Sequence, residues 1–418
     1  MSAWHGRGAF ASGLAGLVAV IGGGSGAAGA EAPVSRAAAG APSAAEVAAY
    51  WTPARMRAAP PLRMRLPAPA TSSGAAPAGS APSFVPPAAQ GEGGAGLIGG
   101  DASTSAFDPG DEKSFPNRLH GRVFATYGGM GDFSCSATAV SSPGRSLVVS
   151  AGHCVFDPRT GMWASRWTFV PGYRDGRAPF GRWVARRLDA ADPWIRSENI
   201  SFDVGTAVVA RNRRGRALQD VIGGRGIGFN QPRDQVYLSF GYPAEMPFDG
   251  ESLRACRSRY RGDDPETGRP RTMRIDCDMS GGSSGGGWVS DGLVLSLNSY
   301  CVGLILICID NESMYGPYFG DGAKKLYLRS RGTPPPLCAG RRATQLGGRG
   351  SQTLAGRPGA DVIVLRGGSD RGAGRGGADR LCGGSGADVL RGGPGADVCV
   401  GGPGADRARG CERRRGIP

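Results

Sequence analysis

CDMSGGSSGGGW, residues Cys277–Trp288, is the stretch that decides how this chain is interpreted. It sets serines among glycines, where the backbone can turn sharply and present its N–H groups to a substrate oxygen. Acyl-transfer enzymes need that arrangement, because a nucleophilic hydroxyl works beside donors that stabilise an oxyanion. The run predicts such a nucleophile, and a glycine-rich loop without catalytic function is the alternative.

Histidine is scarce, which narrows the choice of a base for that hydroxyl. The chain holds only His5, His120 and His153, and none of them follows the serine run. His153 comes after the apolar, largely β-branched stretch 147–149, which predicts a buried strand ending in a small-residue turn. A side chain at such a strand end is held rigidly, so His153 is the predicted general base. A structural histidine beside a disulfide is the alternative.

An acid should orient the imidazole. Asp203 stands at the head of the apolar stretch 204–209 and has apolar neighbours on both sides. A carboxylate buried there needs a partner, which the ring N–H of His153 would supply. A turn or capping role is the alternative. Three other aspartates are weaker candidates: Asp189, Asp192 and Asp310.

The order His153, Asp203, Ser284, with these local motifs, resembles the trypsin-like serine peptidases, and the serine run is most similar to the bacterial branch that includes glutamyl endopeptidases. For residues 116–333 the resemblance implies an all-β, chymotrypsin-like fold of two six-stranded antiparallel β-barrels with the site between them. It implies Ser284 as nucleophile, His153 as base and Asp203 as the group that orients it. The N–H groups of Gly282 and Ser284 would form the oxyanion hole.

Ser283 also fits G-x-S-x-G, the nucleophile motif of α/β-hydrolases. In those enzymes the histidine follows the serine, and no histidine does so here. Ser283 also stands where the digestive peptidases have an aspartate that receives the new N-terminus, so that activation switch is not expected. Gly287 replaces a proline that is usual in the family, which makes the turn less rigid.

Substrate specificity stays open. Asp278 lies six residues before Ser284, where trypsin-like enzymes carry the acid that selects Arg or Lys. The bacterial branch often keeps an aspartate nearby while cutting after other residues, so the sequence does not choose between these outcomes. Ser296 is the second candidate specificity residue.

The N-terminus predicts export. Residues 1–30 have a short basic start, an apolar stretch and a small-residue ending, which is the pattern of a secretory signal peptide. The apolar stretch is too short and too rich in glycine for a membrane span, and no later segment qualifies. We therefore expect a secreted, extracellular protein. A disordered Ala/Gly tail is the alternative.

Ten cysteines fit an oxidising compartment. Cys135 and Cys154 bracket the strand that leads to His153, a placement similar to the disulfide beside the histidine of these peptidases. Four further pairs are expected: Cys256–Cys277, Cys301–Cys308, Cys338–Cys382 and Cys399–Cys411.

Residues 31–115 are rich in Ala, Pro, Gly and Ser, which predicts a mostly disordered region. One island, Val47–Arg57, carries Tyr50, Trp51 and Met56 and resembles a short segment in the pro-regions of secreted bacterial peptidases. The resemblance implies a zymogen whose pro-segment contacts the enzyme and is later removed. An accidental aromatic patch in a linker is the alternative.

The formal net charge is +14, carried almost entirely by arginine. The arginines are scattered, and no basic stripe with interleaved aromatic residues occurs, so nucleic-acid binding is not expected. Retention on an anionic cell envelope fits the charge better.

Aspartates recur at every ninth position near the C-terminus, within a pattern that matches the calcium-binding nonapeptide G-G-x-G-x-D-x-U-x. Calcium prefers six to eight oxygen ligands, which carboxylates and turn carbonyls can supply. Residues 338–412 are thus predicted to form a small parallel β-roll that binds calcium. A disordered glycine-rich tail is the alternative. The predicted ligands are Asp361, Asp370, Asp379, Asp388, Asp397 and Asp406.

Two departures interrupt the repeat. Gln352 replaces the first aspartate, and Gly372 occupies a position that is apolar in the other repeats. The strongest calcium sites are therefore expected within 379–406. The apolar positions should stack inside the roll: Leu354, Ile363, Leu381, Leu390 and Cys399.

These patterns together predict a secreted serine endopeptidase that hydrolyses proteins or peptides, with calcium needed by the tail and not by the catalytic chemistry. One alternative is a catalytically inactive peptidase fold that acts as a calcium-dependent surface-binding or adhesin module. Another is an enzyme whose calcium-stabilised tail only assists secretion and has no binding role.

Overall fold

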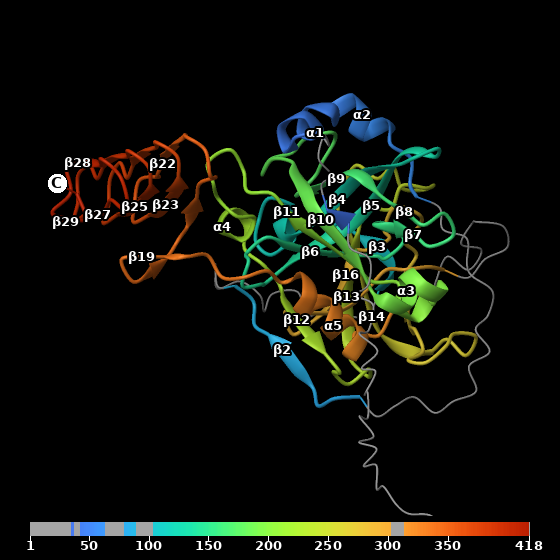
Figure 1. The fold of residues 1–418 in the computed structure, drawn as a ribbon. Helices are drawn as coiled ribbons and strands as arrows, with labels where there is room; N and C mark the ends of the chain where they lie inside the picture. The colour runs from blue at the N-terminus through green and yellow to red at the C-terminus, as the bar shows by residue number, and fades with distance from the viewer. Residues whose placement is uncertain (1–34, 37–41, 63–78, 89–102, 302–312, 418) are drawn as a thin grey trace, which may run out of the picture. The chain divides into compact units, whose positions relative to one another are not determined.

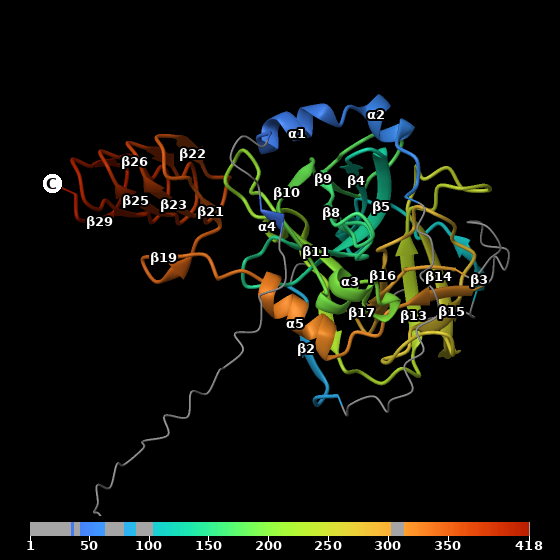
Figure 2. The same cartoon turned by 45° about the vertical axis from the view of Figure 1, so that its right-hand side comes forward.

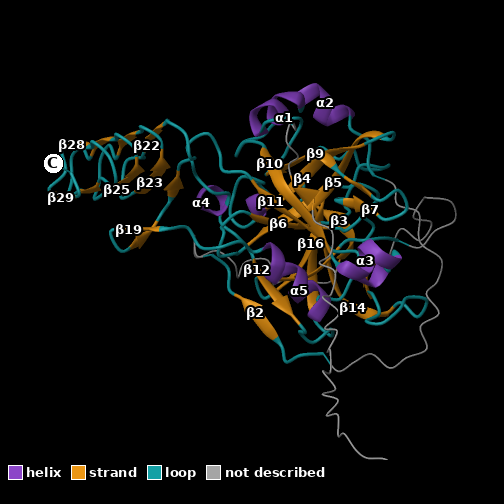
Figure 3. Ribbon diagram, in the orientation of Figure 1, coloured by secondary structure: helices purple, strands orange, loops and turns teal. Residues whose placement is uncertain are grey.

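The structure is a computed structural model of the chain and describes residues 35–36, 42–62, 79–88, 103–301 and 313–417 (Figure 1). Strands dominate these residues, and the helices are short (Figure 3). The predicted signal peptide, residues 1–30, lies outside the described residues. Within the described ranges, no helix has the length and apolar character needed to span a membrane.

Six antiparallel strands close into a barrel. Their order is β10–β11–β6–β5–β4–β9, and the pairing of β9 with β10 completes the circle. The two-residue strand β1 (Ser35–Arg36) pairs with β10 on the outside. The barrel strands are β4 (His120–Tyr127), β5 (Gly131–Val140), β6 (Leu147–Ser150), β9 (Ser165–Pro171), β10 (Trp183–Ala190) and β11 (Gly205–Val209).

The barrel follows the apolar runs of the sequence. Strands were predicted at 122–127, 146–150 and 204–209, and β4, β6 and β11 lie within two residues of those bounds. Val123, Phe124 and Phe169 are completely buried in the interior. The barrel core thus confirms the all-β prediction for this half of the peptidase region.

The second sheet is an open path among the described residues. Its order is β18–β15–β14–β13–β16–β17–β12–β2, and β3 pairs with β14 at the side. Strands were predicted at 236–240 and 294–298, where β13 and β17 are found. No pairing among the described strands closes a second barrel, so that part of the fold stays a prediction. The strands are β2 (Ser83–Val85), β3 (Ser103–Phe107), β12 (Gly226–Phe229), β13 (Val236–Gly241), β14 (Arg254–Asp263), β15 (Met273–Asp276), β16 (Gly287–Ser290), β17 (Leu293–Leu297) and β18 (Ser313–Gly316).

Short helices and one small hairpin complete this region. The hairpin joins β7 (Phe156–Asp157) to β8 (Met162–Trp163) just after the candidate histidine. The 3₁₀ turns and helices are η1 (Asn117–Leu119), η2 (Ile200–Phe202), α1 (Ala44–Tyr50), α2 (Pro53–Ala58), α3 (Asp192–Ser197), α4 (Gln219–Ile222) and α5 (Asp321–Ser330).

Helices α1 and α2 form the segment with the aromatic island, and they lie against the barrel near β9 and β10 in both views (Figures 1 and 2). Trp51 and Met56 are completely buried, and Trp51 Nε1–H donates to the Arg166 carbonyl at 2.8 Å. The Tyr50 hydroxyl donates to the Asp132 carboxylate at 2.9 Å. Although composition predicted little order for 31–115, this segment is folded because Trp51 and Met56 are buried on the barrel.

The same segment continues into the edge of the barrel sheet. Ser134 of β5 donates its N–H to the Pro60 carbonyl at 2.7 Å, and its carbonyl accepts the N–H of Leu62 at 3.0 Å. The Arg122 guanidinium, 1% exposed, lies within 3.4 Å of the Ala59 carbonyl. Residues 43–62 therefore contact the barrel through both apolar and backbone interactions.

The C-terminal repeats form a parallel β-solenoid with two ladders of short strands. Neighbouring strands in a ladder are related by about two nonapeptides, as in the pairing of Ile363 with Leu381. One ladder holds β21 (Gln345–Leu346), β23 (Val362–Gly367), β25 (Arg380–Ser385), β27 (Val398–Val400) and β29 (Arg413–Arg415). The other holds β22 (Thr353–Ala355), β24 (Arg371–Ala373), β26 (Val389–Arg391) and β28 (Arg407–Arg409), and the hairpin of β19 (Leu337–Cys338) and β20 (Arg341–Arg342) precedes both.

The predicted apolar positions stack inside this solenoid. One buried cluster contains Leu354, Ile363, Leu381, Leu390 and Cys399, together with Leu365 and Cys411. A Cβ at Gly372 would lie 3.1–3.4 Å from Leu365, Leu381 and Leu390. Those leucines fill the space at Gly372, so the glycine in an apolar position leaves no gap in the core.

Candidate active site

His153 and Asp203 form a buried, hydrogen-bonded pair. His153 Nδ1 lies 2.8 Å from Asp203 Oδ2, and the backbone N–H of His153 donates to Oδ1 at 2.8 Å. The side chains are 5% and 0% exposed. A carboxylate facing Nδ1 favours the neutral tautomer that carries its proton there, which leaves the Nε2 lone pair to accept a proton. The pair therefore has the chemistry of an oriented base.

Local backbone geometry brings these two residues together. Strand β6 ends at Ser150, and His153 follows in a tight turn, while Asp203 is the residue after η2 and just before β11. A Cβ on Gly152 would lie 2.8 Å from both Asp203 Oδ1 and Trp194 Cδ1. The small-residue turn that the sequence showed is thus needed for close approach of the carboxylate.

A third group contacts the carboxylate. The Ser299 hydroxyl donates to Asp203 Oδ2 at 2.6 Å, and Ser299 is 4% exposed. The sequence interpretation missed this residue, because it lies after β17 and 96 positions from its partner. No local pattern marks a serine there, so the contact is visible only in the folded chain.

Ser284 sits in the loop between β15 and β16 and is partly exposed. Two glycines in this loop have the positive φ angles that favour glycine, 95° at Gly282 and 85° at Gly285. A Cβ on Gly286 would collide with the Phe240 carbonyl oxygen. The glycines of the run are therefore required by the turn and by close packing under the serine.

The direction of the Gly282 N–H is set by the peptide bond that joins Gly281 to Gly282. The Gly281 carbonyl accepts the N–H of Ala244 at 2.7 Å. In a trans peptide the C=O and N–H point in opposite directions, so this anchor directs the Gly282 N–H away from Ala244. No described residue accepts a hydrogen bond from that N–H.

The direction of the Ser284 N–H is likewise set by the peptide bond that joins Ser283 to Ser284. The Ser283 carbonyl accepts the amide of Asn298 at 3.2 Å, which fixes the peptide between Ser283 and Ser284. The N–H on the other side of this peptide has no acceptor in the described part of the chain. Two backbone donors, those of Gly282 and Ser284, are thus free to bind an oxyanion beside Ser284.

Ser136 connects the serine loop to the first barrel. Its N–H donates to the Ser284 carbonyl at 2.7 Å, and its hydroxyl donates to the Gly282 carbonyl at 2.8 Å. The preceding residue, Cys135, is disulfide-bonded to Cys154 beside His153. Strand β5 therefore holds the serine loop and the histidine turn at a fixed separation.

His153 Nε2 is buried and has no hydrogen-bond partner among the described residues. No hydrogen bond joins it to the Ser284 hydroxyl in this structure. Hydrogen bonds between catalytic groups are often long in the free enzyme and shorten when substrate binds. The free Nε2 is the atom that such a bond would use.

The two predicted specificity residues are both engaged. Asp278 Oδ1 accepts the N–H of Ala106 in β3 at 2.7 Å, and burial raises the pKa of Asp278 above its usual value. The Ser296 hydroxyl is completely buried and donates to the Pro317 carbonyl at 2.8 Å. The Ser296 hydroxyl and one oxygen of the partly exposed Asp278 carboxylate thus already have partners within the protein.

Four predicted disulfides are present: Cys135–Cys154, Cys256–Cys277, Cys338–Cys382 and Cys399–Cys411. Cys308, the expected partner of Cys301, lies outside the described residues. In the described part of the chain, Cys135, Cys154 and His153 form a cluster with the spacing of metal ligands. The two sulfurs are already bonded to each other, so this cluster does not provide thiolate ligands.

The six repeat aspartates are buried and form two ladders. Oδ1 of Asp379 accepts the backbone N–H of Asp361 at 2.7 Å, and Asp379 in turn donates its N–H to Asp397 at 2.8 Å. The second ladder runs in the same way through Asp370, Asp388 and Asp406. One oxygen of each acceptor is therefore used to join neighbouring turns.

The other carboxylate oxygen of these residues is available to a cation. Oδ2 is buried and has no hydrogen-bond partner among the described residues at five positions: Asp370, Asp379, Asp388, Asp397 and Asp406. A buried charged oxygen without a partner is unfavourable, and a divalent cation removes that penalty. Burial, together with the nearby charges of Asp397 and Asp361, raises the pKa of Asp379 to about 6. These residues fit calcium.

Asp361 differs from the other five. Its Oδ2 accepts the N–H of Arg357 at 2.6 Å, and the Arg357 guanidinium lies 3.6 Å from Oδ1. At the equivalent place in the other ladder, the Gln352 amide donates to the Leu365 carbonyl and to Asp370 Oδ1, each at 3.1 Å. At the N-terminal end of each aspartate ladder, a hydrogen-bond donor of the protein, Arg357 or Gln352, thus contacts the first aspartate.

Both the peptidase region and the C-terminal repeats are similar to known proteins. The model of the RTX calcium-binding nonapeptide repeat matches residues 346–381 and 373–408. No match was found among curated protein sequences. The predicted calcium-binding tail is confirmed, and calcium is the cofactor of these repeats.

Among solved structures, the protease Anisep from Arthrobacter nicotinovorans is 38% identical, with 51% of this chain and 95% of that chain covered and a TM-score of 0.47. A thermostable serine protease, AL20, from an extremophilic microorganism is 36% identical, with 51% and 97% covered and a TM-score of 0.47. A Glu endopeptidase is 16% identical, with 56% and 99% covered and a TM-score of 0.43. By the identity to the first two, this chain belongs to the family of serine proteases that they represent. The sequence prediction of that family is confirmed.

Proposed function

We propose that the chain is a secreted serine endopeptidase in which Ser284, His153 and Asp203 form the catalytic triad. The observation that carries the proposal is the buried contact between His153 Nδ1 and the Asp203 carboxylate, 2.8 Å long, with Nε2 left free. Asp203 is held in turn by Ser299. Such a base, beside a glycine-rich serine loop with two free N–H donors, supports peptide-bond hydrolysis.

In the proposed mechanism the Ser284 hydroxyl attacks the scissile carbonyl carbon while His153 Nε2 takes its proton. The oxyanion of the tetrahedral intermediate binds the N–H groups of Gly282 and Ser284. His153 then gives the proton to the leaving amine, which leaves an acyl-enzyme on Ser284. Water hydrolyses this ester with His153 again as base, and Asp203 stabilises the imidazolium at each step.

The proposal includes the domain organisation expected from the sequence. Residues 116–333 form the peptidase domain with a second, chymotrypsin-like barrel, and residues 338–412 form the calcium-binding domain. Residues 1–30 direct export, and 31–115 serve as the pro-region of a zymogen. The contacts of residues 43–62 with the barrel support the last point, because a pro-segment acts through direct contact with its enzyme.

Proteins or peptides are the proposed substrates, and the calcium-binding solenoid with the excess of arginine favours retention near an anionic cell envelope. The disulfides support an extracellular site of action, because such bonds persist in oxidising compartments.

The test is covalent labelling of the secreted protein by a fluorophosphonate, read by mass spectrometry. We expect the label on Ser284 only, and we expect Ser284→Ala to lower peptidase activity by at least a thousandfold without changing the fold. Ser283→Ala is the matched control, because its hydroxyl donates to the Ser280 carbonyl and takes no part in the mechanism. A folded, calcium-loaded protein that neither reacts with the label nor cleaves peptides would instead be a surface-binding module.

A further inference from the structure

Arg225 is a buried cation that has no counter-ion among the residues that the structure describes. It lies directly before β12, and its backbone is fixed by hydrogen bonds to Ala139 of β5 and to Ser141, which follows that strand. Its side chain is mostly enclosed, since the residue is 7% exposed. No carboxylate among the described residues lies within ion-pair distance, and its Nε has no hydrogen-bond partner there. Burial lowers the pKa of Arg225 to about 10.

The side chains nearest to Arg225 do not neutralise it. Nη2 lies 3.4 Å from His120 Nε2, and the guanidinium carbon lies 5.6 Å from the centre of the Phe240 ring. Burial, followed by the charge of Arg225, holds the pKa of His120 well below its usual value, so this ring is neutral. Its Nδ1 faces the Thr138 hydroxyl at 3.0 Å, which leaves the lone pair of Nε2 for Arg225.

Arg122 is another buried arginine, and it has a counter-ion. Arg122 is 1% exposed, and its guanidinium pairs with Glu251 at 2.7 Å and with the Ser134 hydroxyl at 3.1 Å. A buried charge is tolerated when it is paired and hydrogen-bonded, and it is costly when it is not. Within the described ranges, Arg225 lacks the anionic partner that Arg122 has.

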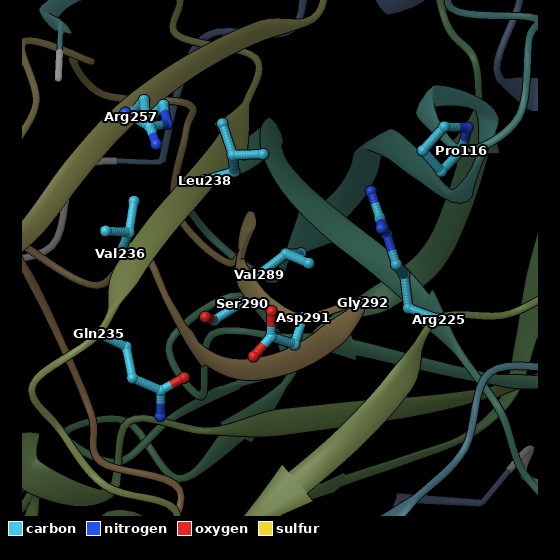
Figure 4. Close-up of a pocket in the computed structure, with 10 residues that line it drawn as sticks. All are labelled: Pro116, Arg225, Gln235, Val236, Leu238, Arg257, Val289, Ser290, Asp291 and Gly292. Carbon is cyan, nitrogen blue, oxygen red and sulfur yellow. The ribbon is translucent and has the colours of Figure 1, made fainter. Parts of the chain in front are cut away.

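Arg225 lines a pocket of about 300 Å³ (Figure 4). Val236 and Leu238 of β13 and Val289 of β16 form an apolar wall, and Arg257 of β14 adds a second cation. In Figure 4 the Arg225 side chain extends along the pocket toward Pro116, on the side away from Arg257. Small-molecule sites combine apolar walls with a few polar groups in this way.

Asp291 is the acidic residue among those that line the pocket. It lies in the exposed turn between β16 and β17 and makes no ion pair with Arg225. The pocket shares no residue with the candidate active site. Its strongest polar feature is therefore an enclosed guanidinium that needs an anion.

We propose that this pocket binds a small organic carboxylate, whose charged end pairs with Arg225 and whose apolar part packs against Leu238 and Val289. A charged guanidinium N–H donates a strong hydrogen bond to a carboxylate oxygen, and Nη1 is the nitrogen left for the ligand, because Nη2 lies beside His120 Nε2 and Nε is buried. The apolar wall adds affinity in proportion to the hydrocarbon area that it covers.

The test uses the full-length protein with Ser284→Ala, which prevents self-cleavage, and hexanoate as the probe. Calorimetry should give saturable binding of one hexanoate. Hexanamide, which has the same shape without the charge, and acetate, which lacks the apolar chain, should each bind at least tenfold more weakly. Equal binding of hexanoate and hexanamide, or no saturable binding of hexanoate, would overturn the proposal.

Arg225→Met supplies the second arm. Because Met removes an unpaired buried charge, the variant should fold and unfold at a temperature equal to or above that of the parent, and it should lose hexanoate binding by at least tenfold. Arg259→Met is the matched control, since Arg259 is exposed on β14, two residues from Arg257, and should bind hexanoate unchanged. A well-folded Arg225→Met protein with unchanged affinity would contradict the proposal, and the comparison of hexanoate with hexanamide decides the question without any variant.

Discussion

The Ser299 hydroxyl donates a 2.6 Å hydrogen bond to Asp203 Oδ2, the same oxygen that faces His153 Nδ1. The carboxylate is completely buried, so its charge depends on the donors around it. In the proposed triad Ser299 is therefore a positioning residue, because it acts on His153 through Asp203.

Replacing Ser299 by Ala should lower kcat about tenfold and leave KM nearly unchanged, because one of the donors to a buried carboxylate is lost. Ser299→Thr, which restores a hydroxyl, should recover part of the activity. Steady-state kinetics on a cleavable peptide measures both. A fall in kcat/KM that comes only from KM would show that Ser299 acts on substrate binding.

Gly286→Ala should prevent formation of the serine loop. The new Cβ would collide with the Phe240 carbonyl oxygen, which belongs to a strand and cannot move easily. We expect a lower unfolding temperature together with loss of fluorophosphonate labelling. Gly350→Ala is the control, because no atom lies within 4 Å of its added Cβ. Normal labelling of Gly286→Ala would mean that the loop has a different backbone.

Asp388→Asn should weaken calcium binding more than Asp361→Asn. Asp388 has a buried Oδ2 without a partner in the described chain, whereas both oxygens of Asp361 already contact Arg357. Calorimetric titration of the full-length protein should therefore show the loss of at least one site for Asp388→Asn and an unchanged number for Asp361→Asn. Equal losses would mean that Arg357 leaves Asp361 when calcium binds.

Calcium binding to the repeats should weaken as the pH falls below about 6, the pKa to which Asp379 is raised. Because the pKa of Asp379 in the folded, calcium-free chain lies above its unfolded value, the folded state binds more protons between about pH 4 and 6. The calcium-free solenoid should therefore lose stability as the pH rises through this window. Circular dichroism of a 338–418 fragment without calcium, at pH 4.5 and 7, measures this. Greater stability at pH 7 would contradict it.

In the full-length Ser284→Ala precursor, Trp51→Ala should lower the free energy of local unfolding of residues 43–62 by about 3–5 kcal/mol. The reason is the loss of a completely buried indole and of its hydrogen bond to Arg166. We expect faster proteolysis within residues 43–62. Phe84→Ala is the control, since Phe84 is 62% exposed and should change little. Equal protease sensitivity of the two variants would show that Trp51 does not hold the segment on the barrel.

Much of the candidate site could be predicted because its signals are local. A histidine after a buried strand, an acid before another and a serine among glycines each appear within a dozen residues of sequence. The nine-residue spacing of the aspartates predicted the solenoid for the same reason, since every turn repeats the same requirements. The described strands of the second sheet form an open path, so the second barrel stays a prediction. The order of residues 43–62 was underestimated, because composition does not show where an aromatic side chain will be buried.

The sequence by itself determined the family, the candidate residues His153, Asp203 and Ser284, and the calcium-binding repeat, because each depends on neighbouring residues and regular spacing. The tertiary structure alone decided the rest. It brought Ser299 to Asp203, directed the N–H groups of Gly282 and Ser284 through anchored carbonyls, and left the buried guanidinium of Arg225 without an ion-pair partner among the described residues. These features depend on contacts between residues far apart in the chain, and only the packing of the two sheets determines which of them meet.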